Sequence, residues 1–549
     1  MSAAAHRSGK HDVKVVNPAA AVASGLLMAF SLPLVVPLFS RNELFASGYL
    51  EPLALLALVP LLVVLRKAGP RRAFGLGALA GGVYFLVSLY WLEVAMTTFG
   101  HMSRLLSLPV LFLLVGFLSL FWACACWAAV RIKERLGVGL HLALPVVWVG
   151  LEFLRNYVLT GFPWAGLGTT QARSLWLAQL ASVGGVYLVA FAVVYTNGVV
   201  EALWAWCRRR AALPRWSVAG WAALLAFTGI FSAVRLGSDP VAEGSRLKVA
   251  VIQGNLDEKA HLRGTAAQRW VLKRMLEQSR LAKERGAEIV VWPEGTLPAA
   301  VPSRGLGHFL AGRVSEAESE LPSEMIIGGI TRQYKAGRLW LTNSAFLMDS
   351  KLSLKARYDK RHLVPFGEYV PLASILPYQW FIPAGVAFFT PGSDHAPLEA
   401  GAGKLGVLIC YEAIFPEIAR QTVSVGAQLL VNITNDSWYG FSSAPYQHLA
   451  ISRMRAIETG RWLVRAANTG VSAVIDPHGR VVAHISLGLA VTDADSISYR
   501  ELPPARHLVR DVALIDGLTI YCIIGDLFAW LCSLLAVVML VATFTMKRI

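Results

Sequence analysis

Eight apolar stretches, each about as long as a membrane-spanning helix, divide this chain into membrane and soluble parts. A span needs about 20 mostly apolar residues to cross the ~30 Å of hydrocarbon in a bilayer. The stretches are residues 18–39, 48–65, 73–99, 105–130, 139–155, 176–203, 216–235 and 518–545. The pattern predicts a polytopic α-helical membrane domain of eight spans, with seven in residues 1–240 and the last at 518–545.

Residues 246–510 follow a different pattern, in which short apolar runs alternate with helix-like segments. The runs are rich in β-branched residues and are bounded by Gly, Pro and Asn: 247–255, 288–294, 325–330, 344–348, 406–411 and 429–434. Near-continuous apolar runs are typical of strands that are covered on both faces. Helix-like segments lie at 266–285 and 443–458. We therefore expect residues 246–510 to form an α/β domain with a covered sheet.

Composition and charge agree with a membrane protein. Of 549 residues, 55% are hydrophobic and 16% are charged, and the mean hydropathy is +0.52; soluble proteins are about a quarter charged. The net charge of +16 argues little for a nucleic-acid partner, because much of it lies in short loops between spans, where it attracts anionic lipid. Lys and Arg gather at alternate loops, as eight spans with both termini in the cytoplasm require. This places residues 246–510 in the periplasm, above a bacterial inner membrane.

Three segments of the soluble domain carry residues suited to catalysis. Residues 291–295 (VWPEG) place Glu294 at the end of a predicted strand. Residues 358–371 (YDKRHLVPFGEYVP) contain Lys360 and Glu368. Residues 406–412 (GVLICYE) end another predicted strand at Cys410, which Tyr411 and Glu412 follow.

Cys410 is the only one of six cysteines in the outer domain, so it has no disulfide partner there although the periplasm is oxidising. Such a thiol is either buried and inert or retained for its reactivity. Glu294 can serve it as a base, and Lys360 as a positive neighbour that also stabilises an oxyanion. Each residue alone also fits an ordinary surface or core position, whereas the three together favour catalysis. His362 and His448 are isolated, and without an HExxH or CxxC pattern we expect no metal and no cofactor.

The three motifs resemble the Glu–Lys–Cys set of the nitrilase (carbon–nitrogen hydrolase) superfamily. The eight spans and four further segments look like its membrane-embedded branch, the apolipoprotein N-acyltransferase family: 160–164 (TGFPW), 434–440 (TNDSWYG), 453–461 (RMRAIETGR) and 467–479 (ANTGVSAVIDPHG). The resemblance implies a nitrilase-like αββα sandwich over the membrane helices. It also implies a ping-pong reaction, in which Cys410 takes an acyl chain from a phospholipid, typically phosphatidylethanolamine, as a thioester. The α-amine of a diacylglyceryl-cysteine apolipoprotein then accepts the chain.

By matching position, the resemblance makes Glu294 the base, Lys360 the oxyanion stabiliser and Glu368 a supporting carboxylate. Tyr411 and Glu412 follow the nucleophile as in the family. The chain departs from the family after the first strand, where relatives often read QGN-I-P-Q with a Lys-Trp soon after. Here the sequence is QGNLDE, and Leu262 stands near the place of that Trp, so a substrate contact made by the Trp has no obvious counterpart.

Residues 371–390 are strongly apolar but too broken by Pro and Gly to span a membrane. They form either a core-packed loop or a lid that dips into the outer leaflet and admits acyl chains, through Trp380, Phe381, Phe388 and Phe389. Two other functions stay open: a membrane-tethered nitrilase-type amidohydrolase, and a transporter or sensor with a non-catalytic domain. Eight spans exceed what an anchor needs, and the intact Glu–Lys–Cys set disfavours a non-catalytic domain, so we favour acyl transfer.

Overall fold

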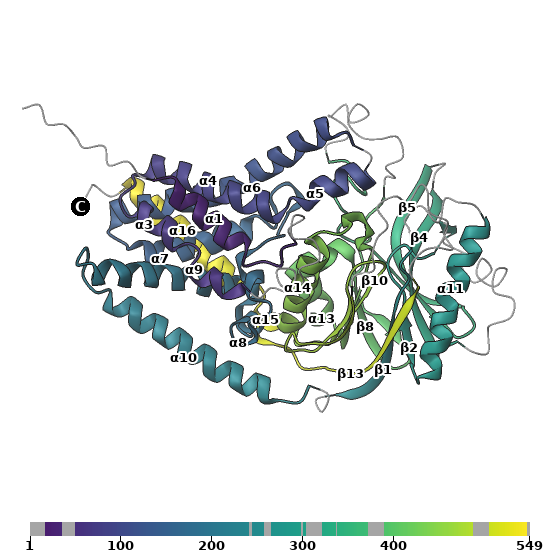
Figure 1. The fold of residues 1–549 in the computed structure, drawn as a ribbon. Coiled ribbons are helices and arrows are strands. Elements are labelled where there is room, and N and C mark those ends of the chain that lie inside the picture. The colour runs from purple at the N-terminus through teal and green to yellow at the C-terminus, as the bar shows by residue number, and fades with distance from the viewer. Residues whose placement is uncertain are drawn as a thin grey trace, which may run out of the picture.

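The molecule consists of a helical bundle and an α/β domain that packs against one end of it (Figure 1). The computed structural model describes residues 17–35, 50–100, 102–240, 244–256, 265–297, 300–302, 321–335, 338–371, 389–486 and 504–545. The main bundle helices are α1 (Ala19–Ala29), α3 (Val59–Leu65), α4 (Pro70–Ser88), α5 (Trp91–Val94), α6 (Arg104–Leu136), α7 (Leu140–Leu154), α8 (Leu175–Ala178), α9 (Ala181–Cys207), α10 (Arg215–Gly237), α15 (Ile520–Ile524) and α16 (Leu527–Thr545).

Helices form in all eight of the predicted apolar stretches, but they differ in length. Among the described residues, α6, α9, α10 and α16 are long and apolar enough to cross a membrane. A fifth span results if α4 and the segment Trp91–Thr98, bent by 49° at a short break, are counted together. The helices at 19–29, 51–65 and 140–154 are apolar but shorter. These helices indicate a membrane domain, while the number of eight spans stays a prediction.

Charged side chains within the bundle have specific partners, as the low polarity of their surroundings requires. Glu201 of α9 accepts hydrogen bonds from Nε and Nη2 of Arg66 at 2.7 and 2.9 Å. Glu152 of α7 accepts from Nε1 of Trp148 at 2.9 Å and from the backbone N–H of Leu167 at 3.0 Å. These bonds fix α7 and α9 against their neighbours and leave neither carboxylate without a donor.

The α/β domain contains two sheets. The seven-stranded sheet has the order β13-β1-β2-β4-β5-β6, with β3 beside β4, and the six-stranded sheet has the order β12-β11-β10-β9-β8-β7. The first comprises β1 (Ser245–Gln253), β2 (Ile289–Val291), β3 (Val301–Pro302), β4 (Glu324–Lys335), β5 (Arg338–Asp349), β6 (Leu354–Asp359) and β13 (Arg506–Leu514). The second comprises β7 (Leu398–Ala400), β8 (Gly403–Ile409), β9 (Leu429–Thr434), β10 (Leu463–Ala467), β11 (Ser472–Ile475) and β12 (Val481–Ile485).

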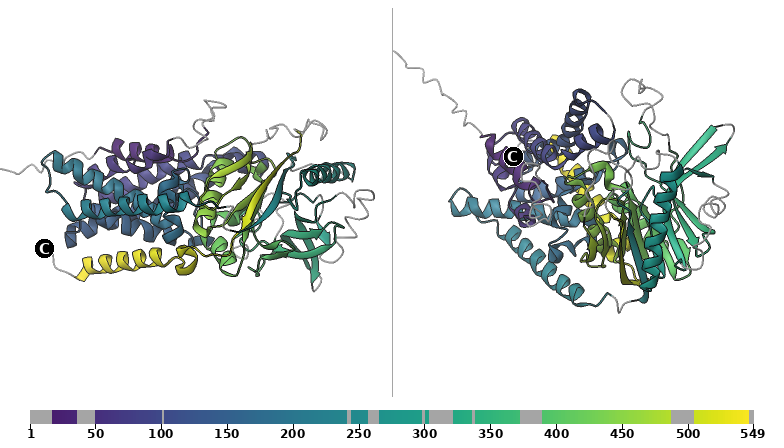
Figure 2. Two further views of the ribbon diagram at one scale, coloured as in Figure 1. Left: turned by 90° about the horizontal axis from the view of Figure 1, so that it is seen from below. Right: turned by 45° about the vertical axis from the view of Figure 1, so that its right-hand side comes forward.

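Three apolar cores hold the layers together. One lies between α11 (Thr265–Glu284) and the first sheet, and a second lies between the two sheets. The third runs without a break from the bundle, through α13 (Pro416–Ser424) and α14 (Ala444–Thr459), to the outer face of the second sheet. The layers therefore follow the order α11, first sheet, second sheet, α13 with α14, which is an αββα sandwich whose inner helical layer is shared with the bundle (Figures 1 and 2).

The strands that enter and leave the domain lie side by side. β1 and β13 pair antiparallel along their full length, from Ser245 opposite Leu514 to Gln253 opposite Arg506. Consequently the α/β domain is an insertion between α10 and α15, and both of its ends face the bundle. From there α16 runs along the side of the bundle, away from the domain (Figure 2).

Gln447, in the first turn of α14, joins the domain to the bundle through its side-chain amide. Its Oε1 accepts hydrogen bonds from the indole N–H groups of Trp91 and Trp164, at 3.2 and 2.7 Å. Its Nε2 donates to the carbonyl oxygens of Pro33 and Ser88, at 3.2 and 3.1 Å. Ser88 and Trp91 flank the break between α4 and α5, so this amide fixes α14 to a bend in the membrane domain.

We expect Gln447→Glu to lower the stability of the protein. A carboxylate can still accept from the two indoles, but it cannot donate to the two carbonyl groups, and each unsatisfied buried acceptor costs about 1–3 kcal/mol. Thermal unfolding in detergent is the measurement, and Gln333→Glu on the exposed side of β4 is the matched control. Equal melting temperatures for the two variants would show that the amide does not anchor α14.

Candidate active site

Cys410 follows directly on the last residue of β8 and begins a short 3₁₀ helix, η9 (Cys410–Ile414). Its backbone has φ = +50°, a left-handed conformation that is uncommon for a residue with a Cβ. Such strain persists only where the surrounding structure holds it, and it gathers at functional sites. The side chain is 7% exposed, so the turn places a thiol in a nearly closed site at the end of a buried strand.

Three of the residues singled out in the sequence form one buried cluster. Lys360, which follows β6 and is 1% exposed, lies between two carboxylates: its Nζ is 2.9 Å from Oε1 of Glu368 and 3.5 Å from Oε1 of Glu294. Asn343 of β5 donates to both carboxylates, at 2.7 Å to Glu294 and 2.9 Å to Glu368. The backbone N–H of Asn435 donates to Oε2 of Glu294 at 2.9 Å. This carboxylate is therefore held at both oxygens.

Burial and charge set the protonation of the cluster. Burial raises the pKa of Glu294, while Lys360 lowers it. For Lys360, burial lowers the pKa, but the Glu368 and Glu294 carboxylates outweigh it and raise the pKa overall. Burial also raises the pKa of the Cys410 thiol, with Glu294 acting in the same direction. The resting site therefore combines a protonated thiol with an ammonium group, and a reaction in which this thiol attacked would need a nearby base.

Glu412 connects the turn after β8 to the segment after β6. One of its carboxylate oxygens accepts from the backbone N–H of Ile409 at 2.7 Å. The other accepts from the Tyr358 hydroxyl at 2.9 Å and from the backbone N–H groups of Arg361 and His362, at 2.7 and 3.3 Å. Glu412 thus fixes the backbone on either side of the site, a role in positioning that differs from direct participation in chemistry.

Tyr411 connects the same turn to the bundle. Its hydroxyl donates to the carbonyl of Gly161 at 3.2 Å, at the end of the 3₁₀ turn Val158–Thr160 that follows α7. Leu159, Thr160 and Gly161 have φ values of +54°, +75° and +88°, so three successive residues are in left-handed or related conformations. One wall of the site is therefore a strained loop of the membrane domain, within the 160–164 segment that the sequence singled out.

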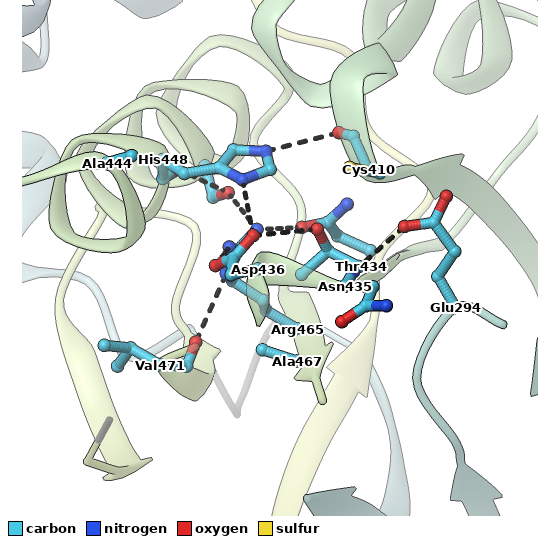
Figure 3. A network of polar contacts seen from close by, with 12 residues as sticks. Glu294, Cys410, Thr434, Asn435, Asp436, Ala444, His448, Arg465, Ala467 and Val471 are labelled. Carbon is cyan, nitrogen blue, oxygen red and sulfur yellow. Dashed lines mark hydrogen bonds and ion pairs between the residues drawn. The ribbon is translucent and has the colours of Figure 1, made fainter. Parts of the chain in front are cut away.

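The structure also shows a polar network behind Cys410 that sequence reasoning missed (Figure 3). Nε2 of His448 lies 3.2 Å from the carbonyl oxygen of Cys410, and Nδ1 lies 3.1 Å from Oδ1 of Asp436. Nη2 of Arg465 donates to the other oxygen of Asp436 at 2.6 Å. His448, on α14, looks isolated along the chain, and its partners come from elsewhere: Cys410 begins η9, Asp436 follows β9, and Arg465 lies in β10. The 434–440 and 453–461 segments pointed to this region, but no spacing rule joins these three side chains.

Several residues of the sequence interpretation lie outside the described part of the chain: Leu262, Trp380, Phe381 and Phe388. Phe389 is described, and its backbone N–H donates to the carbonyl of Glu368 at 2.9 Å. It also forms an isolated β-bridge with Leu341 of β5. The end of the apolar 371–390 segment therefore meets the chain beside the Lys360 cluster. Within the described residues, no group of three His, Cys, Asp or Glu side chains could hold a metal ion.

The two-sheet sandwich, in which Glu294, Lys360 and Cys410 follow strands β2, β6 and β8, is a domain of the carbon–nitrogen hydrolase class. The carbon–nitrogen hydrolase family model matches residues 248–502. The crystal structure of a carbon–nitrogen hydrolase from Helicobacter pylori G27 aligns with 52% of this chain and 95% of its own, at 19% sequence identity and a TM-score of 0.37.

Comparisons that include the helical bundle assign the chain to a more specific family. The model of the apolipoprotein N-acyltransferase N-terminal domain matches residues 24–199. The chain is 37% identical to an apolipoprotein N-acyltransferase of Geobacter metallireducens, over 96% of this chain and 95% of that protein. It is 33% identical to one of Vibrio cholerae, over 80% and 86% of the two chains. The chain belongs to the apolipoprotein N-acyltransferase family.

Proposed function

We propose that this protein transfers a fatty acyl chain from a phospholipid to the N-terminal α-amine of a diacylated apolipoprotein, with Cys410 as the nucleophile. The observation that carries the proposal is the ion-pair cluster of Glu294, Lys360 and Glu368, with Glu294 facing Cys410 (Figure 3). The shared name of the relatives supports the acceptor class. The contact of Tyr411 with Gly161, which belongs to the helical bundle, supports a lipid donor.

In the first step, Glu294 takes the proton from Sγ of Cys410 as the sulfur attacks the ester carbonyl of the donor, typically phosphatidylethanolamine. Lys360 stabilises the negative charge that develops on the carbonyl oxygen. The C–O bond then breaks, and the departing glycerol oxygen of the lysophospholipid takes the proton from Glu294. The acyl chain remains on Cys410 as a thioester.

In the second step, the α-amine of the acceptor's diacylglyceryl-cysteine attacks the thioester, and Lys360 again stabilises the oxyanion. The C–S bond breaks, an amide forms, and the proton lost by the amine passes through Glu294 to the Cys410 sulfur. Glu368 supports both steps because its contact with Lys360, at 2.9 Å, keeps the ammonium charged and in place. The cycle is ping-pong, since the first product leaves before the acceptor reacts.

The same proposal includes the placement in a bacterial inner membrane. Residues 1–240 would supply seven spans and 518–545 the eighth, with both termini in the cytoplasm and residues 246–510 in the periplasm. The alternation of basic loops supports this topology. So does the course of α10 and α16, which both extend along the bundle away from the α/β domain (Figures 1 and 2). Acyl chains would enter past a lid at 371–390, formed by Trp380, Phe381, Phe388 and Phe389.

Intact mass tests the nucleophile and the donor together. Purified protein exposed to phosphatidylethanolamine of one acyl composition should gain the mass of one acyl group, and hydroxylamine should remove it. Adding a diacylated lipopeptide should discharge the adduct and yield a triacylated peptide. Cys410→Ala should show neither event.

Three results would contradict the proposal. An equal adduct on Cys410→Ala would place the acyl group on another residue. An adduct that never reaches the lipopeptide would exclude it as acceptor. Release of free fatty acid without a triacylated product would instead indicate the amidohydrolase-like alternative, in which water resolves the thioester.

A further inference from the structure

We infer that His448 is a positioning residue for acyl transfer, which holds the Cys410 carbonyl so that the adjoining Tyr411 N–H is turned to the oxyanion. The inference deepens the proposed function and rests on it, because it assumes that Cys410 is the nucleophile. It assigns a task to a buried imidazole that the two-step chemistry above does not use.

The first argument is the geometry of one peptide group. His448 is fully buried, and its Nε2 lies 3.2 Å from the Cys410 carbonyl oxygen (Figure 3). None of the described peptide bonds is cis, so in the planar group that joins Cys410 to Tyr411 the carbonyl and the N–H point in opposite directions. A carbonyl held toward α14 therefore turns the Tyr411 N–H away from α14. This N–H lies in the first turn of η9, where backbone donors have no partner within the helix.

The second argument is that the imidazole is itself held in one orientation. Nδ1 of His448 lies 3.1 Å from Oδ1 of Asp436, which also accepts from the Thr434 hydroxyl at 3.0 Å. Arg465 donates to the other carboxylate oxygen at 2.6 Å. Burial opposes ionisation of Asp436, but Arg465 and His448 outweigh it and hold its pKa at about 2. Asp436 is thus a fixed acceptor that aims the ring at the Cys410 carbonyl.

The third argument is the attachment of α14. Gln447, the residue before His448, is bound by Trp91 and Trp164 and donates to Ser88 and Pro33. The turn of α14 that carries His448 is therefore fixed to the membrane helices as well as to the second sheet. Through His448, the backbone of Cys410 is positioned relative to the bundle, from which a lipid donor would arrive.

Each ring nitrogen of His448 makes one contact. Substitution of His448 by Gln or by Asn can preserve one of these contacts and remove the other. Both contacts are with acceptors, and the ring donates to both at once only when each ring nitrogen carries a proton. Burial and Arg465 lower the pKa of His448 overall, while its contacts with Asp436 and the Cys410 carbonyl act against that lowering. An amide donates without titrating. The amide nitrogen of Gln reaches the position of Nε2, and that of Asn reaches the position of Nδ1. His448→Gln can therefore keep the Cys410 contact, while His448→Asn can keep only the Asp436 contact.

The test is the rate of acyl-Cys410 formation from saturating phosphatidylethanolamine, followed by intact mass. His448→Gln should stay within about tenfold of wild type. His448→Asn should lose about 10²-fold or more, since an oxyanion donor contributes about 10²–10³ to the rate. Alkylation of Cys410 by iodoacetamide forms no oxyanion, so its rate should be similar in all three proteins.

The controls separate positioning from folding. His448→Leu makes neither contact and is a second variant that should lose rate. The melting temperature of each variant is measured. Equal rates for the Gln and Asn variants, or the reverse order, would overturn the inference. So would failure of both the Asn and Leu variants to fold, because the imidazole would then serve the fold. If wild type forms no acyl adduct, the proposed function itself is wrong and the inference goes with it.

Discussion

Lys360→Met is expected to slow acyl-enzyme formation by about 10²–10³ and to destabilise the α/β domain. The ammonium lies 2.9 Å from Glu368 and 3.5 Å from Glu294, so its removal leaves two buried carboxylates facing each other. Breaking a buried ion pair by removing one partner costs about 3–5 kcal/mol. Loss of the charge that stabilises the oxyanion accounts for the lower rate. Thermal unfolding and the rate of the acyl adduct, measured on the same preparation, check both effects.

A double variant separates the two effects of Lys360. Lys360→Met with Glu368→Gln removes one of the two uncompensated carboxylates, so it should recover much of the stability and none of the activity. Lys404→Met is the surface control, because Lys404 is half exposed and lies 3.8 Å from an exposed carboxylate of Glu399. It should change stability by less than about 1 kcal/mol. A wild-type melting temperature for Lys360→Met, or activity in the double variant, would refute this account.

Glu294→Gln should reduce the rate of acyl-Cys410 formation by about 10²–10⁴, the usual contribution of a general base. The reason is that burial raises the pKa of the Cys410 thiol, and an amide cannot accept its proton. The pH profile gives a second readout. Burial also raises the pKa of Glu294, so its basic form is lost, as pH falls, at a higher pH than for an exposed Glu. The wild-type rate should therefore fall as the pH drops through the pKa of Glu294. The rate of Glu294→Gln should show no such acid limb.

Stability measurements show whether a lower rate in Glu294→Gln reflects the loss of the base or a loss of folded protein. The Gln amide would face two donors, Asn343 and the Asn435 N–H, so a loss of about 1–3 kcal/mol is expected. Glu399→Gln, at an exposed position, is the matched control for the change of charge. A Glu294→Gln protein that forms the adduct at the wild-type rate, with the same acid limb, would exclude Glu294 as the base.

The strands and helices that could be predicted from the sequence are those with a strong local pattern. The run at 429–434 is β9, and the helix-like segment at 266–285 is α11 within one residue at each end. Two of the strands that were missed, β6 and β13, have weak or mixed patterns. β6 is largely exposed along its length, and β13 carries Arg and Asp residues on its exposed part. β6 pairs with β5, the strand just before it, whereas the place of β13 in the sheet depends on β1, far away in the chain.

The residues of the candidate site also fall into two groups, those that the sequence could predict and those that it could not. Glu294, Lys360 and Cys410 each follow directly or closely on a strand, so the sequence could predict that they meet, and the first two do so within one ion-pair cluster. Their catalytic roles stay predictions. Asn343 and His448 carry no local signal: the first lies within β5 and donates to Glu294 and Glu368, and the second contacts Asp436 and Cys410. Only the folded sandwich brings these side chains to the site.

The pairing of β1 with β13 sets an order of events during synthesis. β13 is the edge strand of the first sheet and the last strand to be made, so β1 waits for its partner while residues 254–505 are translated. At about 5–20 residues per second, that wait is roughly ten to fifty seconds. During it, the unfinished sheet presents an open edge, which is a template for pairing with other chains. The same late segment continues into α16, which packs on α6 and α7, so the ribosome completes the sheet and the bundle in one final stretch of the chain.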